Sequence, residues 1–422
     1  MPQGDPTAPR AETSAAQGPD TPDARPHAAL WPGVAPSGRA AADRASRDAA
    51  VMLGLTLPGD TLLYLLLPLH AAAFGVSLAE AGLLLAANRL VRIIGYGWVA
   101  RFYTRRGPRA SCILAVLGAA AAAGFYAFSH GVWWLLVGRL LWGLAFAAMN
   151  IATQALATAL AEGAARRSGT SRAIISTGPM LGLLAGAVLA ELQGPRVVFM
   201  ALAAVSLLAL PLARRLPDGP GEALRPAGLR FGLPARLDVW SFVQGMALDG
   251  VFILGLSVLA AAALPHGAAL AAGAALASRY ASEILLAPPA GRLAERFGAL
   301  PVLVAVSMVS AAGIALVGLG ALWIGAVAVV GLRGLLQPLP APVAAAANPG
   351  PARVPALARM ATWRDMGAGV GPLVAGMLLP LVPPALLYGG TALALALASL
   401  ALLPRFGGAG RQARGGAGRY TP

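Results

Sequence analysis

Apolar runs of roughly 20 residues, separated by short polar breaks, follow one another from residue 49 to residue 403. A run of this length can cross the hydrocarbon core of a bilayer as one helix. The pattern predicts twelve membrane-spanning helices, at residues 49–71, 77–100, 109–129, 132–161, 171–191, 196–213, 238–263, 268–291, 300–320, 322–346, 356–380 and 383–403. Only 12% of the residues are charged, about half the fraction of a soluble domain.

Landmark residues recur along the chain at an offset of roughly 190 positions. Asp60 matches Asp249, Arg139 matches Arg333, and the pair Gly178-Pro179 matches Gly371-Pro372. Self-similarity of this kind predicts an all-α membrane protein built from two pseudo-symmetric six-helix bundles. We expect bundles at 47–213 and 238–403, joined by a cytosolic linker at 214–237. A disordered tail at 1–46, rich in Pro and Ala without apolar periodicity, and a basic tail at 404–422 flank them.

Arginine accounts for every basic residue and is concentrated in alternate breaks between the apolar runs. By the positive-inside rule these breaks, and with them both termini, face the cytosol. The net charge of +15 does not indicate nucleic-acid binding, because the arginines lie between apolar runs and form no continuous face. The exclusive use of Arg, with abundant Ala, Gly and Pro, suggests GC-rich coding and hence a bacterial cytoplasmic membrane.

Four motifs occur in order on the expected helices and loops. The break that follows the helix at 268–291 has a Gly, an acid, a base and a Gly at fixed spacing. The break after 77–100 has a copy in which Ala100 replaces the first Gly and Thr104 replaces the acid. The helices at 132–161 and 171–191 contain Arg-xxx-Gly-xxx-Ala and Gly-Pro motifs. The residues are Gly291, Glu295, Arg296 and Gly298; Thr104, Arg105 and Gly107; Arg139, Gly143 and Ala147; and Gly178, Pro179 and Gly182. Together these motifs resemble those of the major facilitator superfamily.

The resemblance implies a monomeric alternating-access secondary transporter in the lipid bilayer, with a small-molecule substrate, protons as coupling ions and no cofactor. The loop motif braces the closed cytosolic gate in that family, so Thr104 puts one brace in doubt. The Gly-Pro motif favours proton-coupled efflux of a small amphipathic or charged compound. Proton-coupled uptake of an organic anion, and a receptor that transports nothing, remain alternatives. An enzyme is disfavoured, because the His residues lie in the tail or near outer loops and the single Cys112 forms no metal cluster.

Four ionisable residues are expected near the middle of the membrane. Asp60 and Asp249 lie about 20 Å along their helices, and Arg89 and Arg279 lie at a similar depth in the next ones. An ionised side chain there costs at least ~3 kcal/mol, so we expect the ion pairs Asp60–Arg89 and Asp249–Arg279, or at least proximity of these residues within each half. Either carboxylate could bind a proton when its arginine moves away. Alternatively, the pairs only hold neighbouring helices together.

A second set of charges is exchanged between the halves. Arg92 corresponds to Glu283, and Arg172 corresponds to Asp365. The superfamily architecture places helix 2 opposite helix 11 and helix 5 opposite helix 8. The resemblance therefore implies the pairs Arg92–Asp365 and Arg172–Glu283 as a cytosolic gate. The alternative is that Arg172 and Arg364 are plain helix-end cations.

The central cavity of this family is lined by helices 1, 4, 7 and 10. That placement makes six polar residues candidates for substrate contact: Arg139, Arg333, Asn150, Gln154, Gln244 and Gln337. Two arginines there would favour an anionic or zwitterionic substrate. Alternatively, both bind backbone carbonyl groups or helix ends. Gly178, Pro179, Gly182, Gly371 and Pro372 are candidates for sites where helices pack closely and bend.

Overall fold

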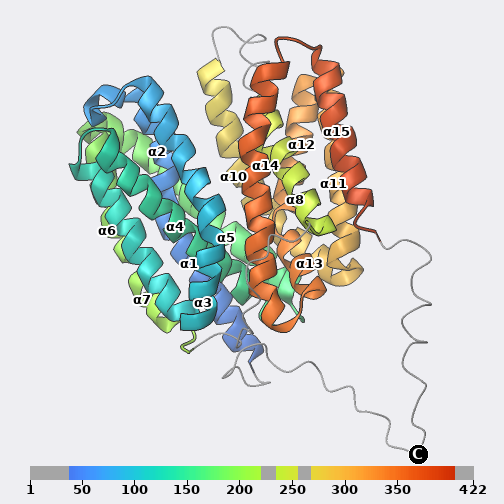
Figure 1. Ribbon diagram of the computed structural model, residues 1–422, viewed down its shortest axis with the longest axis horizontal. Coiled ribbons are helices and arrows are strands. Elements are labelled where there is room, and N and C mark those ends of the chain that lie inside the picture. The colour runs from blue at the N-terminus through green and yellow to red at the C-terminus, as the bar shows by residue number, and fades with distance from the viewer. Residues whose placement is uncertain (1–37, 220–233, 255–267, 404–422) are drawn as a thin grey trace, which may run out of the picture.

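The computed structural model describes residues 38–219, 234–254 and 268–403, and in these ranges helices are the regular elements. Figure 1 shows two helical bundles side by side, the first from blue to green and the second from yellow to red. Eight described helices are long and apolar enough to cross a membrane. One of them, α3, covers two of the expected spans, while residues 255–263 of the expected span 238–263 lie outside the described ranges. The count of twelve therefore stays a prediction.

The first half of the chain contains eight elements. They are α1 (Arg39–Thr56), α2 (Pro58–Leu69), the short 3-10 helix η1 (Ala71–Phe74), α3 (Leu78–Phe128), α4 (Val132–Ala157), α5 (Ala164–Gln193), α6 (Pro195–Leu207) and α7 (Leu210–Arg215). These helices share one apolar core, in which alanines dominate the α1, α3 and α4 faces.

The second half repeats this plan. Its elements are α8 (Arg236–Gln244), the π-helix η2 (Gly245–Val251), α10 (Ala268–Phe297), α11 (Ala299–Gly318), α12 (Leu322–Leu336), α13 (Pro340–Ala347), the 3-10 helix η3 (Gly350–Ala352), α14 (Arg353–Leu378) and α15 (Pro384–Leu400). A second core joins them, centred on Trp240, Phe252 and Tyr388.

The structure differs from the expected boundaries at several places. Residues 39–46, assigned to the tail, are helical, and Ser46 contacts Ser171 of α5 at 2.9 Å between hydroxyls; residues 1–37 and 404–422 lie outside the described ranges. The single helix expected at 322–346 divides into α12 and α13, because Pro338 and Pro340 supply no backbone N–H. The loop expected after residue 100 is helical except at Gly107, whose φ of +81° suits glycine.

Close backbone contacts fix the helix pairs that position the cavity. A Cβ atom added to Gly178 of α5 would lie 1.8 Å from the carbonyl oxygen of Gly54 in α1. In the second half, a Cβ atom on Gly371 of α14 would lie 2.5 Å from the Met246 carbonyl oxygen of η2. Small residues at these crossings let the helices touch, as expected for the glycine motifs. Both α5 and α14 continue unbroken through Pro179 and Pro372.

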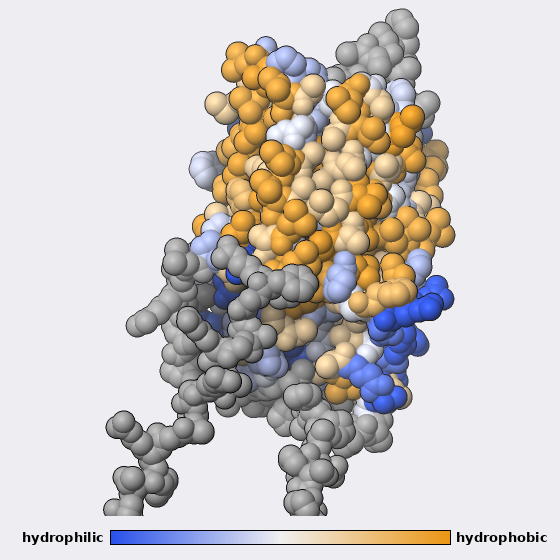
Figure 2. All heavy atoms as spheres, turned by 90° about the vertical axis from the view of Figure 1, so that its right-hand side faces the viewer, coloured by the Kyte–Doolittle hydropathy of each residue, from blue (hydrophilic) through white to orange (hydrophobic). Residues whose placement is uncertain are grey.

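The outer surface is apolar over most of its height. Figure 2 shows hydrophobic residues covering one face, with hydrophilic residues gathered near its lower end. Large exposed apolar side chains include Leu285, Ile324, Val327, Leu373 and Leu393. Exposed apolar surface of this extent is suited to lipid.

The two halves meet at the end of the molecule that carries the turns near Arg166, Arg296 and Arg353, called here the arginine-rich end. There α5 and α10 touch backbone to backbone, since a Cβ atom on Gly169 would lie 2.4 Å from the Ala287 carbonyl oxygen. Figure 1 shows the ribbons of the two bundles converging at this lower end and separating at the upper one. The halves are therefore in contact at the arginine-rich end.

Candidate functional site

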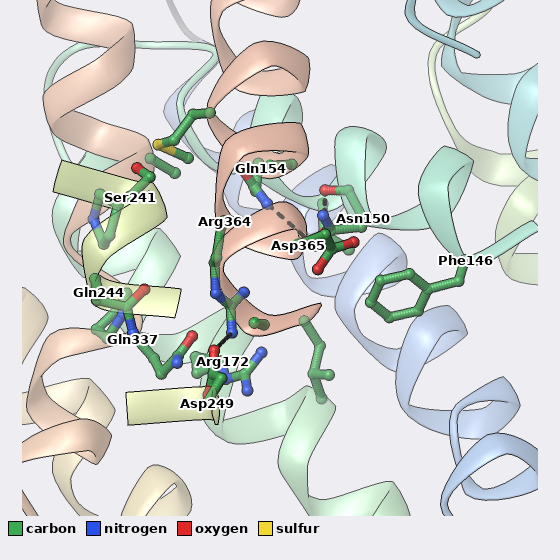
Figure 3. A pocket seen from close by; sticks show the side chains of 18 of the residues that line it. Phe146, Asn150, Gln154, Arg172, Ser241, Gln244, Asp249, Gln337, Arg364 and Asp365 are labelled. Carbon is green, nitrogen blue, oxygen red and sulfur yellow. Dashed lines mark hydrogen bonds and ion pairs between the residues drawn. The ribbon is translucent and has the colours of Figure 1, made fainter. Parts of the chain in front are cut away.

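A cavity of about 460 Å³ lies between the two halves. Its walls come from α2, α3, α4 and α5 on one side and from α8, η2, α10, α14 and the break between α12 and α13 on the other. Figure 3 shows its polar side chains converging from both halves. Four residues predicted to line a cavity do so here: Asn150, Gln154, Gln244 and Gln337. Gln154 donates to the Asn150 side-chain oxygen at 3.0 Å, and the Asn150 amide faces the Tyr96 hydroxyl at 3.4 Å.

Asp60 forms its ion pair with Arg139, at 2.6 Å between Oδ1 and Nη1, so the predicted pair with Arg89 is wrong. Asn88 also donates to the same oxygen. Successive residues of a helix point about 100° apart, and it is Asn88 that faces the bundle interior while Arg89 faces the cavity. Arg89 instead donates to the backbone carbonyl of Ala368 in the other half.

Arg139 lies behind the cavity wall and not on it. Its side chain is 0% exposed, and its Nε donates to the Leu84 carbonyl at 3.0 Å in addition to the contact with Asp60. The charge is therefore buried, paired and bonded to backbone, so it meets neither a substrate in the cavity nor the lipid. Arg139 thus binds a backbone carbonyl, as the alternative expectation stated, and binds Asp60 as well.

Asp249 holds two arginines, neither of which is the predicted Arg279. Arg333 reaches its Oδ1 with Nε at 3.1 Å and also with Nη2, and Arg364 reaches its Oδ2 at 3.0 Å. Arg333 is 1% exposed, so it too lies behind the cavity wall. The side-chain amide of Gln337, turned so that its oxygen faces the two guanidinium groups, accepts from both.

Glu283 is 0% exposed and lies among three arginines. Arg172 of the first half contacts one carboxylate oxygen at 2.8 Å, and Arg333 contacts the other at 2.8 Å. The Ser176 hydroxyl donates to the oxygen that Arg172 holds. Arg279 lies one helical turn before Glu283, with its Nε 3.8 Å away, beyond hydrogen-bonding distance.

Arg92 and Asp365 form the other ion pair between the halves, at 2.9 Å between Nε and Oδ2. The alignment of these two atoms does not meet hydrogen-bond geometry, so the contact is electrostatic. The Arg92 guanidinium also stacks over the Phe146 ring, 4.7 Å from its centroid. Arg92–Asp365 and Arg172–Glu283, the two inter-half bridges, thus occur as the family resemblance implied; their role in gating is a proposal.

Arginines outnumber acids on the cavity wall. The wall carries Arg89, Arg92, Arg172, Arg279 and Arg364 against Asp60, Asp249 and Asp365. Two predicted roles are exchanged: Arg89 and Arg279 line the cavity, while Arg139 and Arg333 bind the aspartates from behind its wall. Arg364, which the sequence offered only as a helix-end cation, binds Asp249, and an Arg-Asp pair inside an apolar helix was a usable signal. Thr61 and Tyr280, whose hydroxyls lie 3.3 Å apart across the cavity, gave no comparable signal.

The two loop motifs differ at the arginine-rich end. Glu295 accepts from the backbone N–H of Arg166 at 3.2 Å, so it caps the first turn of α5 in the opposite half. Thr104 donates instead to the carbonyls of its own helix at Ala100 and Arg101. The remaining motif residues contribute shape: Gly291 packs on the Ala165 backbone, Gly298 ends α10 with φ of +90°, Arg296 stacks on Phe297 and Arg105 is exposed.

The family profile described as Major Facilitator Superfamily matches residues 49–264, half of the chain. The chain belongs to the major facilitator superfamily. Membership establishes a multi-pass membrane transporter, not an enzyme. Comparison with curated proteins gives no match.

Solved superfamily structures share this fold. The human organic anion transporter MFSD10 (TETRAN) superposes with a TM-score of 0.70 at 18% identity, over 86% of this chain and 99% of that one. A variant of the E. coli fucose:proton symporter FucP gives 0.68 at 14%, over 85% and 98%. The proton:xylose symporter XylE, bound to 6-bromo-6-deoxy-D-glucose, gives 0.67 at 15%, over 86% and 95%. Identities this low show the common fold alone.

Proposed function

We propose that this chain is a proton-coupled symporter of a small organic anion. The observation that carries the proposal is the placement of Arg89 and Arg279. They occupy matching positions in the two halves, and both line the cavity. In the described part of the chain Arg89 has no carboxylate partner, while Arg279 forms an ion pair with Glu283 at 3.8 Å, too long for a hydrogen bond. Two guanidinium groups on the wall of one cavity, one from each half, suit a carboxylate or phosphate by charge and by their planar donors.

The charge balance of the site supports an anion. Seven arginines and four acids surround the cavity, counting those just behind its wall: Arg89, Arg92, Arg139, Arg172, Arg279, Arg333 and Arg364 against Asp60, Asp249, Glu283 and Asp365. The excess of three positive charges lies in a low-dielectric region, where uncompensated charge is costly. A bound anion offsets part of that cost, whereas a cation adds to it.

Symport follows from competition for the arginines. When a substrate anion binds Arg364 or its neighbours, Asp249 loses part of its positive surroundings and binds a proton more readily. Anion and proton therefore load together. A cationic substrate would instead compete with the proton for the carboxylate, which is the basis of antiport. MFSD10, described as an organic anion transporter, and the two proton symporters provide parallels on the same fold.

The efflux antiport suggested by the Gly178-Pro179 motif stays a prediction that the same experiment tests. We further propose that the arginine-rich end and both termini face the cytosol of a bacterium, by the positive-inside rule, and that the protein works as a monomer.

The test uses purified protein in liposomes with an imposed pH gradient, with and without a protonophore. Labelled mono- and dicarboxylates and phosphate esters are compared with neutral and cationic analogues of similar size. We expect accumulation of an anion toward the alkaline side, abolished by the protonophore. Movement toward the acidic side would establish antiport and overturn symport.

Arginine variants test the binding site in the same assay. Arg89→Gln and Arg279→Gln should each lower anion uptake by about tenfold or more, the effect of losing one charge-assisted contact. The matched control is Arg106→Gln, which alters an exposed arginine on α3. Uptake of a neutral or cationic compound, unaffected by Arg89→Gln and Arg279→Gln, would contradict the anion proposal.

A further inference from the structure

Both inter-half bridges are connected to one carboxylate, Asp249. The first connection runs through Glu283, which shares its two oxygens between Arg172 of the first half and Arg333 of the second. Arg333 in turn holds Asp249. The side chain of Arg333 therefore lies between the carboxylate of the first bridge and Asp249.

The second connection runs through two neighbouring residues of α14. Arg364 pairs with Asp249, while Asp365 pairs with Arg92 across the interface. Adjacent helical residues point about 100° apart, so one turn of α14 can contact Asp249 in its own half and Arg92 in the other half. Figure 3 shows Arg364 reaching Asp249 and Asp365 directed toward the side of Phe146 and Asn150.

Asp60, the repeat counterpart of Asp249, has no such connection in the described part of the chain. Its contacts there are with Arg139 and Asn88, both in its own half. The position that corresponds to Glu283 is Arg92, so the first half lacks the acid that would extend the chain of ion pairs. The two aspartates occupy corresponding positions in the repeats, but only Asp249 is connected through ion pairs to the other half.

We propose that Asp249 alone is the proton-binding residue that releases the arginine-rich end, and that Asp60 is structural. Protonation adds one proton to the Asp249 carboxylate and removes its negative charge. Arg333 then retains Glu283 as its remaining acid and competes for it with Arg172. Arg364 turns to the neighbouring acid, Asp365, and competes for it with Arg92. Each acid of an inter-half bridge thus gains an arginine partner from its own half.

The net charge of the two halves also favours their separation when Asp249 is protonated. Around the cavity, the first half has four arginines and one acid (Arg89, Arg92, Arg139 and Arg172; Asp60), and the second has three arginines and three acids (Arg279, Arg333 and Arg364; Asp249, Glu283 and Asp365). The charged groups that face Asp249 from its own half belong to α10, α12 and α14. The four arginines and Asp60 of the first half face these groups across the interface. A proton on Asp249 makes the second half positive opposite a half that is already positive, so the halves repel each other at the bridges.

The inference rests on the proposed function only in taking the proton as the coupling ion, and its test needs no substrate. Spin labels are attached to cysteines at Arg106 of α3 and Ala347 of α13, which are exposed positions in opposite halves at the arginine-rich end. The native Cys112 is buried and is replaced by alanine. Distance distributions between the labels are measured by pulsed electron paramagnetic resonance in lipid nanodiscs, from mildly alkaline to mildly acidic pH.

Acidification should add a longer-distance component in the otherwise unaltered reporter protein. Asp249→Asn should show that component already at alkaline pH and respond little to acid. The matched variant Asp60→Asn should keep the short distance at alkaline pH and the full response to acid. If Asp249→Asn does not fold, the unaltered reporter and Asp60→Asn still keep the inference falsifiable, because either can overturn it.

Three outcomes would overturn the inference: no change in the unaltered reporter on acidification, loss of the acid response in Asp60→Asn, or an Asp249→Asn protein that keeps both the short distance and the acid response. Proton-coupled anion transport without any distance change would overturn this inference alone. A distance change that follows Asp249 in a protein that carries no anion would overturn the proposed function alone.

Discussion

Arg92 and Asp365 belong to different halves of the chain, and their side chains meet at 2.9 Å between Nε and Oδ2. Both side chains are mostly buried. An ion pair between two rigid bundles holds them in one relative orientation only while the pair is intact, so this contact is suited to stabilising one state of the transport cycle.

Exchange of the two charges tests this bridge. Arg92→Asp and Asp365→Arg should each lower the transport rate by about tenfold, as an interaction free energy of about 1.4 kcal/mol implies, because each leaves two like charges facing each other. The double variant should recover most of the rate. Uptake into liposomes is the measurement, with Arg101→Asp on the exposed face of α3 as the control. A double variant no better than either single one would show that the contact is incidental.

The Asp60–Arg139 pair should contribute to stability more than to transport. Asp60→Leu leaves the fully buried Arg139 guanidinium without its carboxylate, which costs about 3–5 kcal/mol when a buried pair is broken. The combination Asp60→Leu with Arg139→Met removes both charges and should restore most of the melting temperature in detergent. It should also retain pH-dependent transport, and loss of that dependence would contradict a structural role.

The contact between α1 and α5 predicts a strict requirement for glycine at residue 178. Gly178→Ala places a methyl group 1.8 Å from the Gly54 carbonyl oxygen, so the helices must separate, at a cost of about 1–3 kcal/mol or more. Gly124→Ala is the control, because a Cβ atom there meets nothing within 4 Å and alanine favours the helix. Thermal denaturation in detergent should show a lower melting temperature for Gly178→Ala only. Equal melting temperatures would mean that the crossing adapts without cost.

A buried hydrogen bond in the second half predicts a further loss of stability. The Trp240 indole N–H donates to the Ser399 hydroxyl at 3.1 Å, and both side chains are 0% exposed. Ser399→Ala leaves the indole N–H without an acceptor, which costs about 1–3 kcal/mol. In the control, Ser310→Ala removes a buried hydroxyl that donates to its own helix, at Val306. The melting temperature should fall for Ser399→Ala and change little for Ser310→Ala; the reverse order would contradict the role of this bond.

Several features of the protein could be derived from the order of its residues. The length and spacing of the apolar runs predicted membrane-spanning helices, because only a helix satisfies its own backbone hydrogen bonds in lipid. The exchange of charge between the repeats, with the family architecture, led to Arg92–Asp365 and Arg172–Glu283. Opposite charges at matching positions attract across a pseudo-symmetric interface, whereas identical charges would repel.

Only the tertiary structure decided which arginine holds which aspartate. Residue spacing gives the depth of a side chain along a helix, at about 1.5 Å per residue, and by depth alone Arg89 was a suitable partner for Asp60. The direction in which a side chain points depends on how the helix is rotated against its neighbours, and that rotation is set by packing over the whole bundle. One position along α3 separates buried Asn88, which binds Asp60, from Arg89, which faces the cavity. For the same reason the link from Asp249 to both inter-half bridges exists only in the folded protein.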